Sequence, residues 1–268
     1  MRACVACTLA LLLVSRAAGA QAGDVDSSAS APPPGLSGFD DPSEVSYWER
    51  GKPCWFFAAT LELGFAYVRP KLAAGRVRPH WEWVGLETLP LVTLDGVGLY
   101  GGLRGEVPNL DARLGVRYFA PFARTLLPEQ DRHGRLEIER EDGPNGRYVA
   151  YEAEIAPHVS VFGGTLFSVL TAYYVPNIQS GYHLYEESLK VVMAPPFVWR
   201  ARLGYAFGLG PRRMIRVGPA AEVIGLPGRD EQVWRPGVVS AVQVSDSLDV
   251  QATLLPVVSS PDTIGLAG

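Results

Sequence analysis

The stretch Phe197–Leu209, FVWRARLGYAFGL, alternates between two kinds of side chain and decides the fold class. Every second residue from Phe197 onward is apolar, whereas the intervening positions carry Arg200, Arg202 and small residues. A period of two residues is typical of a β-strand that has one face in an apolar environment and the other in a polar one. Its thirteen residues exceed the roughly 9 to 11 that a tilted strand needs to cross a membrane.

The same alternation recurs along most of the chain, in about eleven candidate segments. The clearest of the others are residues 55–67, 110–118, 215–223 and 248–254. Residues 81–92 alternate poorly, and residues 182–193 also fit a helical period. Short turn sequences such as Asp95-Gly96 and Ser245-Asp246-Ser247 separate many of the segments. The pattern predicts an all-β fold, an antiparallel up-and-down membrane β-barrel of about 10 to 12 strands.

Four regions follow from composition along the chain. Residues 1–20 combine Arg2, an apolar run around Leu9 to Val14, and Ala18-Gly19-Ala20, which together predict a secretory signal peptide. Residues 21–52, with Pro32-Pro33-Pro34, are expected to form a flexible periplasmic leader. We expect the strands in residues 53–258, interrupted by a long charged loop at about 120–146, and a C-terminal tail at 259–268.

The composition also limits the chemistry that the chain can perform. Its 268 residues carry a formal net charge of −4, and removal of residues 1–20 makes it more acidic, which argues against nucleic acid as a partner. Only Cys54 remains after that removal, so neither an intrachain disulfide nor a cysteine metal cluster is expected. Four scattered histidines and the lack of a Gly-rich phosphate loop predict no metal and no cofactor.

The signal peptide, the alternating segments, the short turns against one long loop, and aromatic residues near strand ends resemble bacterial outer-membrane β-barrel proteins. The aromatic residues in question are Trp55, Trp81, Tyr118, Tyr173 and Trp199. The resemblance implies a Gram-negative outer-membrane location and lipid as a partner, but it identifies no specific family. Such barrels have even strand numbers, so one strand is missed or split, around residues 81–92 or 44–50. A terminal aromatic strand end, which many such barrels carry, is absent here.

The same periodicity also fits a secreted or periplasmic soluble β-protein that binds an apolar ligand. In that alternative the apolar faces point into a core, and the charged faces point to water. Phe197, Leu203 and Phe207 are then expected to be buried. Strand length, end-placed aromatic residues and a charged fraction of only 19% favour the membrane barrel.

In a barrel, the charged and small faces of the strands line the lumen. Because unpaired charges in a confined lumen are costly, we expect them to form ion pairs that hold a narrow barrel shut. The alternative is a pathway for a small polar or anionic solute, attracted by the arginines. The predicted lumen-lining residues are Glu62, Arg104, Asp111, Arg113, Arg117, Glu152, Arg200, Arg202, Arg216 and Glu222.

One pair of residues suggests an enzymatic alternative. His158 and Ser160 share a strand face, and outer-membrane lipid A deacylases use a His-x-Ser pair of this kind. Glu152 or Glu154 is placed to orient the histidine as the third member of a triad. The pair shares its face with glutamates expected in the lumen, however, so the sequence favours a non-enzymatic barrel, either a narrow channel or a closed structural or surface protein.

Overall fold

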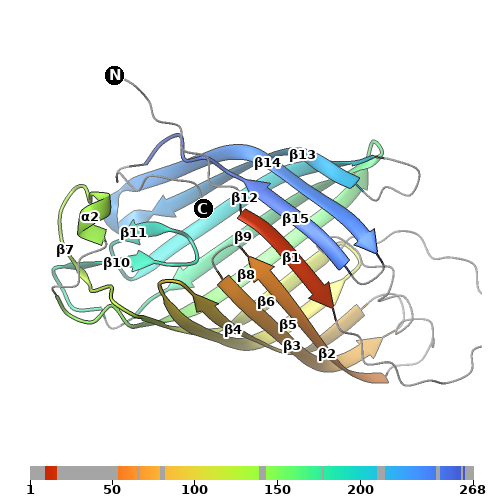
Figure 1. The fold of residues 1–268 in the computed structure, drawn as a ribbon, viewed down its shortest axis with the longest axis horizontal. Helices are drawn as coiled ribbons and strands as arrows, with labels where there is room; N and C mark the ends of the chain where they lie inside the picture. The colour runs from red at the N-terminus through yellow and green to blue at the C-terminus, as the bar shows by residue number, and fades with distance from the viewer. Residues whose placement is uncertain are drawn as a thin grey trace, which may run out of the picture.

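The computed structural model describes residues 10–16, 54–64, 67–78, 82–138, 143–176, 178–209, 215–245, 248–260 and 262. Within these residues the chain is all-β and antiparallel, as predicted, and eleven long strands form one sheet in sequence order (Figure 1). They are β2 (Cys54–Gly64), β3 (Tyr67–Arg78), β4 (Glu82–Thr93), β5 (Gly96–Val107), β6 (Leu110–Pro121), β8 (Tyr148–Val161), β9 (Gly164–Tyr174), β12 (Phe197–Leu209), β13 (Ile215–Leu226), β14 (Glu231–Ser245) and β15 (Leu248–Leu254).

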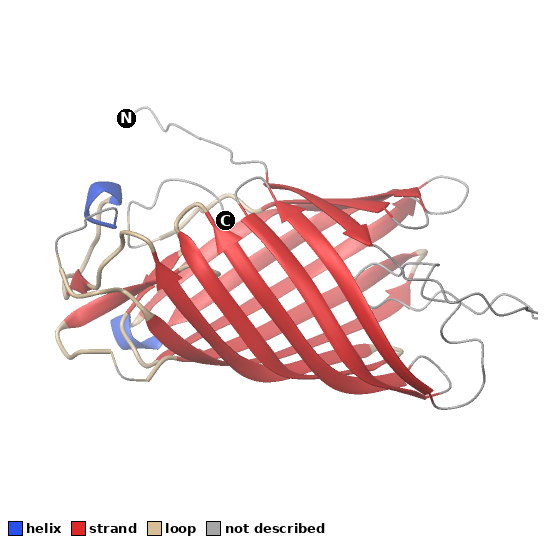
Figure 2. Ribbon diagram, turned by 60° about the horizontal axis from the view of Figure 1, so that its bottom comes forward, coloured by secondary structure: helices blue, strands red, loops and turns tan. Residues whose placement is uncertain are grey.

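The two edges of this sheet, β2 and β15, are both paired with a twelfth strand, β1 (Ala10–Arg16). β1 runs antiparallel to β15 from Ala10↔Thr253 to Ser15↔Leu248, and antiparallel to β2 from Leu13↔Leu63 to Arg16↔Thr60. Through this one strand the sheet comes round into a ring (Figure 2). β1 lies within the apolar run of the predicted signal peptide. The ring is therefore closed by a segment that is also expected to act as an export signal.

The antiparallel order places successive connections at opposite ends of the sheet. One end carries the long connections between β6 and β8 and between β9 and β12, and we call it the plugged mouth. At the other, the far end, the connections between consecutive strands from β3 to β15 have two to five residues, and residues 17–53 connect β1 to β2. At the plugged mouth lie a small sheet of β7 (Leu127–Pro128), β10 (Tyr182–Glu186) and β11 (Val191–Met193) and a helical turn, α2 (Arg135–Ile138) (Figure 1).

The apolar faces of the strands point outward. Phe197, Leu203 and Phe207 are 39%, 57% and 48% exposed, so the expectation of the soluble alternative that they form a core is wrong. Outward apolar side chains recur around the sheet; examples are Trp55, Leu86, Leu103, Leu114, Ile155, Leu170 and Val238. The outer surface of the sheet is therefore apolar, an arrangement opposite to that of a soluble β-sandwich.

The main apolar core lies inside the plugged mouth. The hairpin formed by β10 and β11 packs there against inward side chains of six wall strands. The hairpin contributes Leu184, Leu189, Val191 and Met193, and the wall contributes Phe119, Tyr148, Ala150, Tyr173, Val198, Ile224, Leu226 and Val233. Residues 182–193, predicted as one of the eleven strands or as a helix, are instead this plug hairpin.

Two further predictions differ from the structure. Residues 67–78 are not among the segments expected to be strands, because Arg69-Pro70 is expected to end the preceding one, yet they form β3. Pro70 lies on the outward face, and the strand continues through it. This missed strand and the extra segment 182–193 cancel, so the expected count of eleven is right for the wrong reason. Tyr173 is buried inside, and Tyr174 is the outward aromatic residue. Trp81 and residues 44–50 lie outside the described residues.

Removal of residues 1–20 is expected to leave β2 and β15 with one free edge each. The amide protons that face β1 should then exchange faster than those of β8 and β9, which keep neighbours on both sides. Hydrogen exchange with mass spectrometry on the full chain and on a chain starting at Gln21 measures this. Unchanged protection of both edges would mean that another segment takes the place of β1.

Candidate functional site

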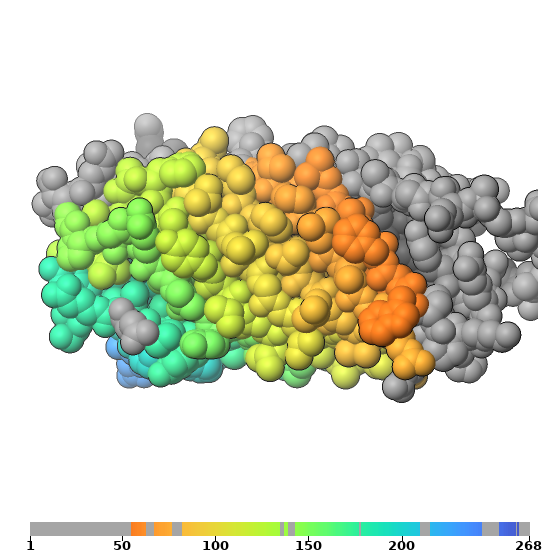
Figure 3. All heavy atoms as spheres, turned by 90° about the horizontal axis from the view of Figure 1, so that it is seen from below, coloured from red at the N-terminus to blue at the C-terminus, as the bar shows by residue number. Residues whose placement is uncertain are grey.

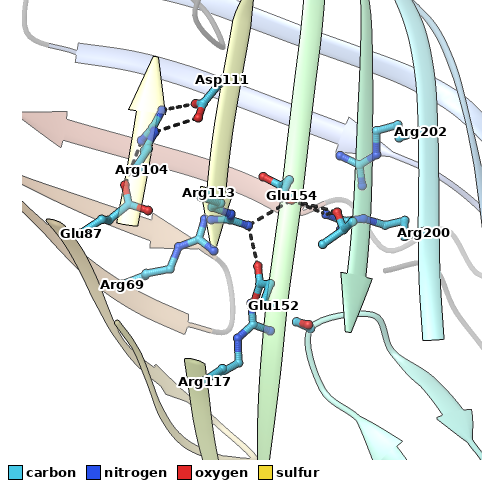
Figure 4. A network of polar contacts seen from close by, with 12 residues as sticks. Arg69, Glu87, Arg104, Asp111, Arg113, Arg117, Glu152, Glu154, Arg200 and Arg202 are labelled. Atoms are coloured by element: carbon cyan, nitrogen blue, oxygen red, sulfur yellow. Dashed lines mark hydrogen bonds and ion pairs between the residues drawn. The ribbon is translucent and has the colours of Figure 1, made fainter. Parts of the chain in front are cut away.

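The inner face of the sheet carries a network of opposite charges (Figure 4). Successive side chains of a strand point to opposite faces of the sheet. Because the apolar residues of these strands point outward, the charged residues between them point inward. Nine of the ten predicted lumen-lining residues form ion pairs on this inner face. Arg216 is half-buried and lies on the same face of β13. Apart from the pair of Glu62 with Arg69, these ion pairs form three clusters that follow one another around the wall.

The first cluster surrounds Glu87 on β4, which is 3% exposed. Its Oε2 atom lies 2.8 Å from Lys71 Nζ and 2.9 Å from Arg104 Nη1. Arg104 also pairs with Asp111, and its guanidinium lies 5.5 Å from the ring centre of Trp83. Two cations thus compensate the charge of this buried carboxylate, both at Oε2.

The second cluster surrounds two carboxylates of β8. Glu152, which is fully buried, has Oε1 2.9 Å from Arg113 Nη2 and also pairs with Arg117. Glu154 Oε2 lies 3.1 Å from both Arg113 Nη2 and Arg200 Nη2. Figure 4 shows these side chains pointing toward one another from β6, β8 and β12. The arginines predicted to attract a solute are therefore occupied by carboxylates of the wall.

The third cluster joins the wall to the plug hairpin. Glu222 on β13 pairs with Arg202 at 2.6 Å and with Arg235 at 3.1 Å. Arg235 Nη2 also donates to the main-chain oxygens of Leu189 and Lys190, at 2.8 and 3.1 Å. The hairpin turn is thus bonded to β14 through a buried guanidinium.

Glu186 at the end of β10 makes a second polar link to the wall. It is fully buried and accepts hydrogen bonds from Tyr148 Oη at 3.0 Å and from the Leu189 N–H at 2.6 Å. Arg117 Nη1 lies 3.6 Å from the same carboxylate. Together with the apolar packing, these bonds hold the hairpin inside the mouth.

A separate set of polar contacts joins the long loop, the β13–β14 connection and the C-terminal segment. Asp262 accepts a hydrogen bond from the His133 N–H at 2.9 Å and pairs with Arg229 at 2.6 Å. Burial opposes ionisation of Asp262, but hydrogen bonds from His133 and Arg229 lower its pKa. Burial lowers the pKa of His183, and the neighbouring His133 and Arg229 side chains lower it further. The ring centres of His183 and His133 lie 5.2 Å apart. The C-terminal segment is thereby tied to the long loop beside the plug hairpin.

Sequence reasoning missed several members of the network. Two of them, Lys71 and Arg69, lie on β3, the strand that was not recognised in the sequence. Arg69 Nη2 is 2.5 Å from Glu62 Oε2. Glu87 lies on the poorly alternating segment 81–92, and Arg235 lies in none of the segments named from the sequence. The two-residue period shows that these residues face inward only when the strands are extended to their full lengths. Glu186 cannot be found in this way, because it lies on the plug hairpin and not on a wall strand.

The pair His158 and Ser160 lies on the inner side of β8, in the same alternation as Glu152 and Glu154. His158 Nε2 is 3.0 Å from the main-chain oxygen of Pro108 in the β5–β6 turn. This contact gives one nitrogen of the buried His158 ring a polar partner at the far end. The apolar outer surface, where a lipid substrate would lie, is on the opposite side of the strand, so the geometry does not favour the hydrolase alternative.

Comparison with protein-family models, curated proteins and solved structures finds no match for this chain. Over the described ranges, no helix is long and apolar enough to cross a membrane. In the same part of the chain, no group of three or more His, Cys, Asp or Glu side chains is placed to hold a metal ion. What the site can do is therefore argued from its own geometry.

The central carboxylate offers a direct test of the network. Glu152→Ala leaves Arg113 and Arg117 buried without their shared partner and should lower the free energy of unfolding by about 3 to 5 kcal/mol. Glu62→Ala removes a partly exposed pair and should cost at most about 1 kcal/mol. Urea titration of the folded protein in vesicles measures both, and equal losses would contradict a special role for Glu152.

Proposed function

We propose that the chain is a non-enzymatic β-barrel of a Gram-negative outer membrane, closed in its resting state. The observation that carries the proposal is the direction of the two faces: apolar side chains cover the outside, and paired charges fill the inside. Lipid is the medium that makes such an exterior favourable, since a closed sheet leaves no unpaired backbone edge in the hydrocarbon.

The far end is the better candidate for the periplasmic side. Its connections between strands from β3 to β15 have two to five residues, and barrels of this class have short periplasmic turns and longer external loops. Residues 17–53 join β1 to β2 at the far end as well. On this orientation the long charged loop and the plug hairpin face the cell exterior, which fits a surface-exposed barrel.

Two features support a closed barrel over an open channel. The carboxylates of the wall and of the hairpin occupy the inward arginines, so an anion in transit would have to displace them. The plug hairpin adds an apolar core across one mouth, which is impassable to hydrated ions while it stays in place. A channel for a small anionic solute is the second candidate, favoured by Arg117 and Arg235, which the hairpin covers.

The outward direction of Leu203 gives the test of membrane insertion. It lies six residues from either end of β12, and Leu203→Arg should destabilise the protein in lipid by about 2 to 4 kcal/mol. Leu209→Arg, at the far end of the same strand, should cost only about 0 to 1 kcal/mol. Urea unfolding in vesicles and boiling-dependent gel migration are the measurements; equal stability of both variants would exclude a spanning β12.

The closed state is tested by conductance. The wild-type barrel in a planar bilayer should be silent, whereas replacement of residues 182–193 by a short Gly-Ser linker should give steady, anion-selective current because Arg117 and Arg235 lose their plug partners. Deletion of residues 139–142 from the charged loop, which leaves the sequence of the hairpin unchanged, is the control and should stay silent. Steady current through the wild-type protein would contradict closure.

A further inference from the structure

The outer surface carries a shallow apolar furrow of about 630 Å³ that crosses β4, β5, β6, β8 and β9 and reaches β12. Its floor is made of small outward residues: Gly105, Ala112, Ala153 and Ala172. Larger side chains such as Leu103, Leu114 and Leu170 stand beside them. The charged residues that border it, for example Arg113 and Glu154, are chain neighbours of these outward residues, and their side chains are paired on the other side of the wall.

The register shows where the furrow begins. Arg76 is paired with Val84, Val84 with Gly105, and Gly105 with Ala112. Each of these four residues lies two positions from the end of its strand at the far end. Ala153 and Ala172 lie eight positions from those ends, so the furrow starts near the rim and runs toward the middle of the wall. Figure 3 views the outer surface on which β3 to β8 lie side by side, from orange to green.

The length of the furrow suits one lipid chain. Four interstrand steps lead from β4 to β9, and at about 4.8 Å each they span about 19 Å. Half of a hydrocarbon core of about 30 Å is about 15 Å. An inclined furrow of this length therefore runs through about one leaflet, from the rim to the bilayer centre.

The rim end of the furrow carries charge on an otherwise apolar surface. Arg76 is exposed and outward-facing, and its other strand neighbour is the exposed Trp55. Indole rings and basic side chains are favoured at the level of lipid headgroups, and a guanidinium binds a phosphate by charge-assisted hydrogen bonds. Glu82, also outward on β4, is diagonal to Arg76, at roughly 7 to 8 Å for such positions. The two charges match a headgroup that carries both a phosphate and an amine.

We propose that this surface binds one zwitterionic phospholipid of the periplasmic leaflet, with its phosphate on Arg76 and one acyl chain in the furrow. The proposal rests on the barrel and the orientation proposed above. It assigns to the outer face a specific lipid site in addition to the general contact that every membrane barrel makes.

Two glycines of β5 supply a matched test. A Cβ on Gly105 would meet only the Trp83 main-chain oxygen, at 3.9 Å, and a Cβ on Gly101 would meet nothing within 4 Å. Leucine is therefore accommodated at both positions, but only Gly105→Leu fills the furrow. The full-length protein and its variants are refolded into vesicles of phosphatidylethanolamine, phosphatidylglycerol and lipid A, released in mild detergent, and examined by native mass spectrometry.

The wild-type protein and Gly101→Leu should each retain one phosphatidylethanolamine. Gly105→Leu should lose it, and Arg76→Gln should retain it roughly tenfold less, the loss expected for one charge-assisted hydrogen bond. Equal retention by Gly105→Leu and Gly101→Leu, retention of lipid A or phosphatidylglycerol instead, or no retained lipid would each overturn the proposal. Boiling-dependent gel migration of the same samples shows whether the barrel has folded. A folded barrel that retains no lipid refutes only the lipid site, whereas an unfolded chain refutes the proposed barrel.

Discussion

Every charge on the inner face must find an opposite charge within the wall, because the plug and the surrounding strands leave it little water. The strand register meets this demand directly. Glu62 is opposite Arg69, Arg113 is opposite Glu154, and Glu222 is opposite Arg202 on one side and Arg235 on the other. A slip of one residue would turn these charges outward and the apolar residues inward. Ion pairing and the apolar exterior therefore select the same register.

The wall encloses two kinds of interior, which stabilise the fold in different ways. In the middle, long arginine side chains reach carboxylates on neighbouring strands, so the charges there are paired between strands. At the plugged mouth, Tyr148, Val198 and Ile224 turn inward instead and pack on the β10–β11 hairpin. Buried apolar area of this kind is the main stabilising term in water-soluble domains. Arg235 connects the two regions, since it binds Glu222 and the hairpin main chain with one guanidinium.

The sequence predicted the all-β class, the antiparallel order and the inward set of charges, because a two-residue period reports directly which side chains share a face. It failed where that period is hidden. Pro70 and the run of basic residues concealed β3, since proline is uncommon inside strands. Residues 182–193 were ambiguous because a plug hairpin is buried on both faces and shows no alternation. The partners of Glu87 could not be assigned either, because they depend on which strands are neighbours.

The ring itself is the feature that sequence reasoning explains least. Eleven strands end with β2 and β15 parallel to each other, since each runs from the far end to the plugged mouth. The strand between them must therefore run in the opposite direction, which is what β1 does. It also brings the count to twelve, an even number of the kind that single-chain bacterial barrels have. The apolar run of residues 10–16 meets these requirements of direction and pairing, and the same run carries the features of an export signal. If export removes it, closure requires a substitute strand that is antiparallel to both edges.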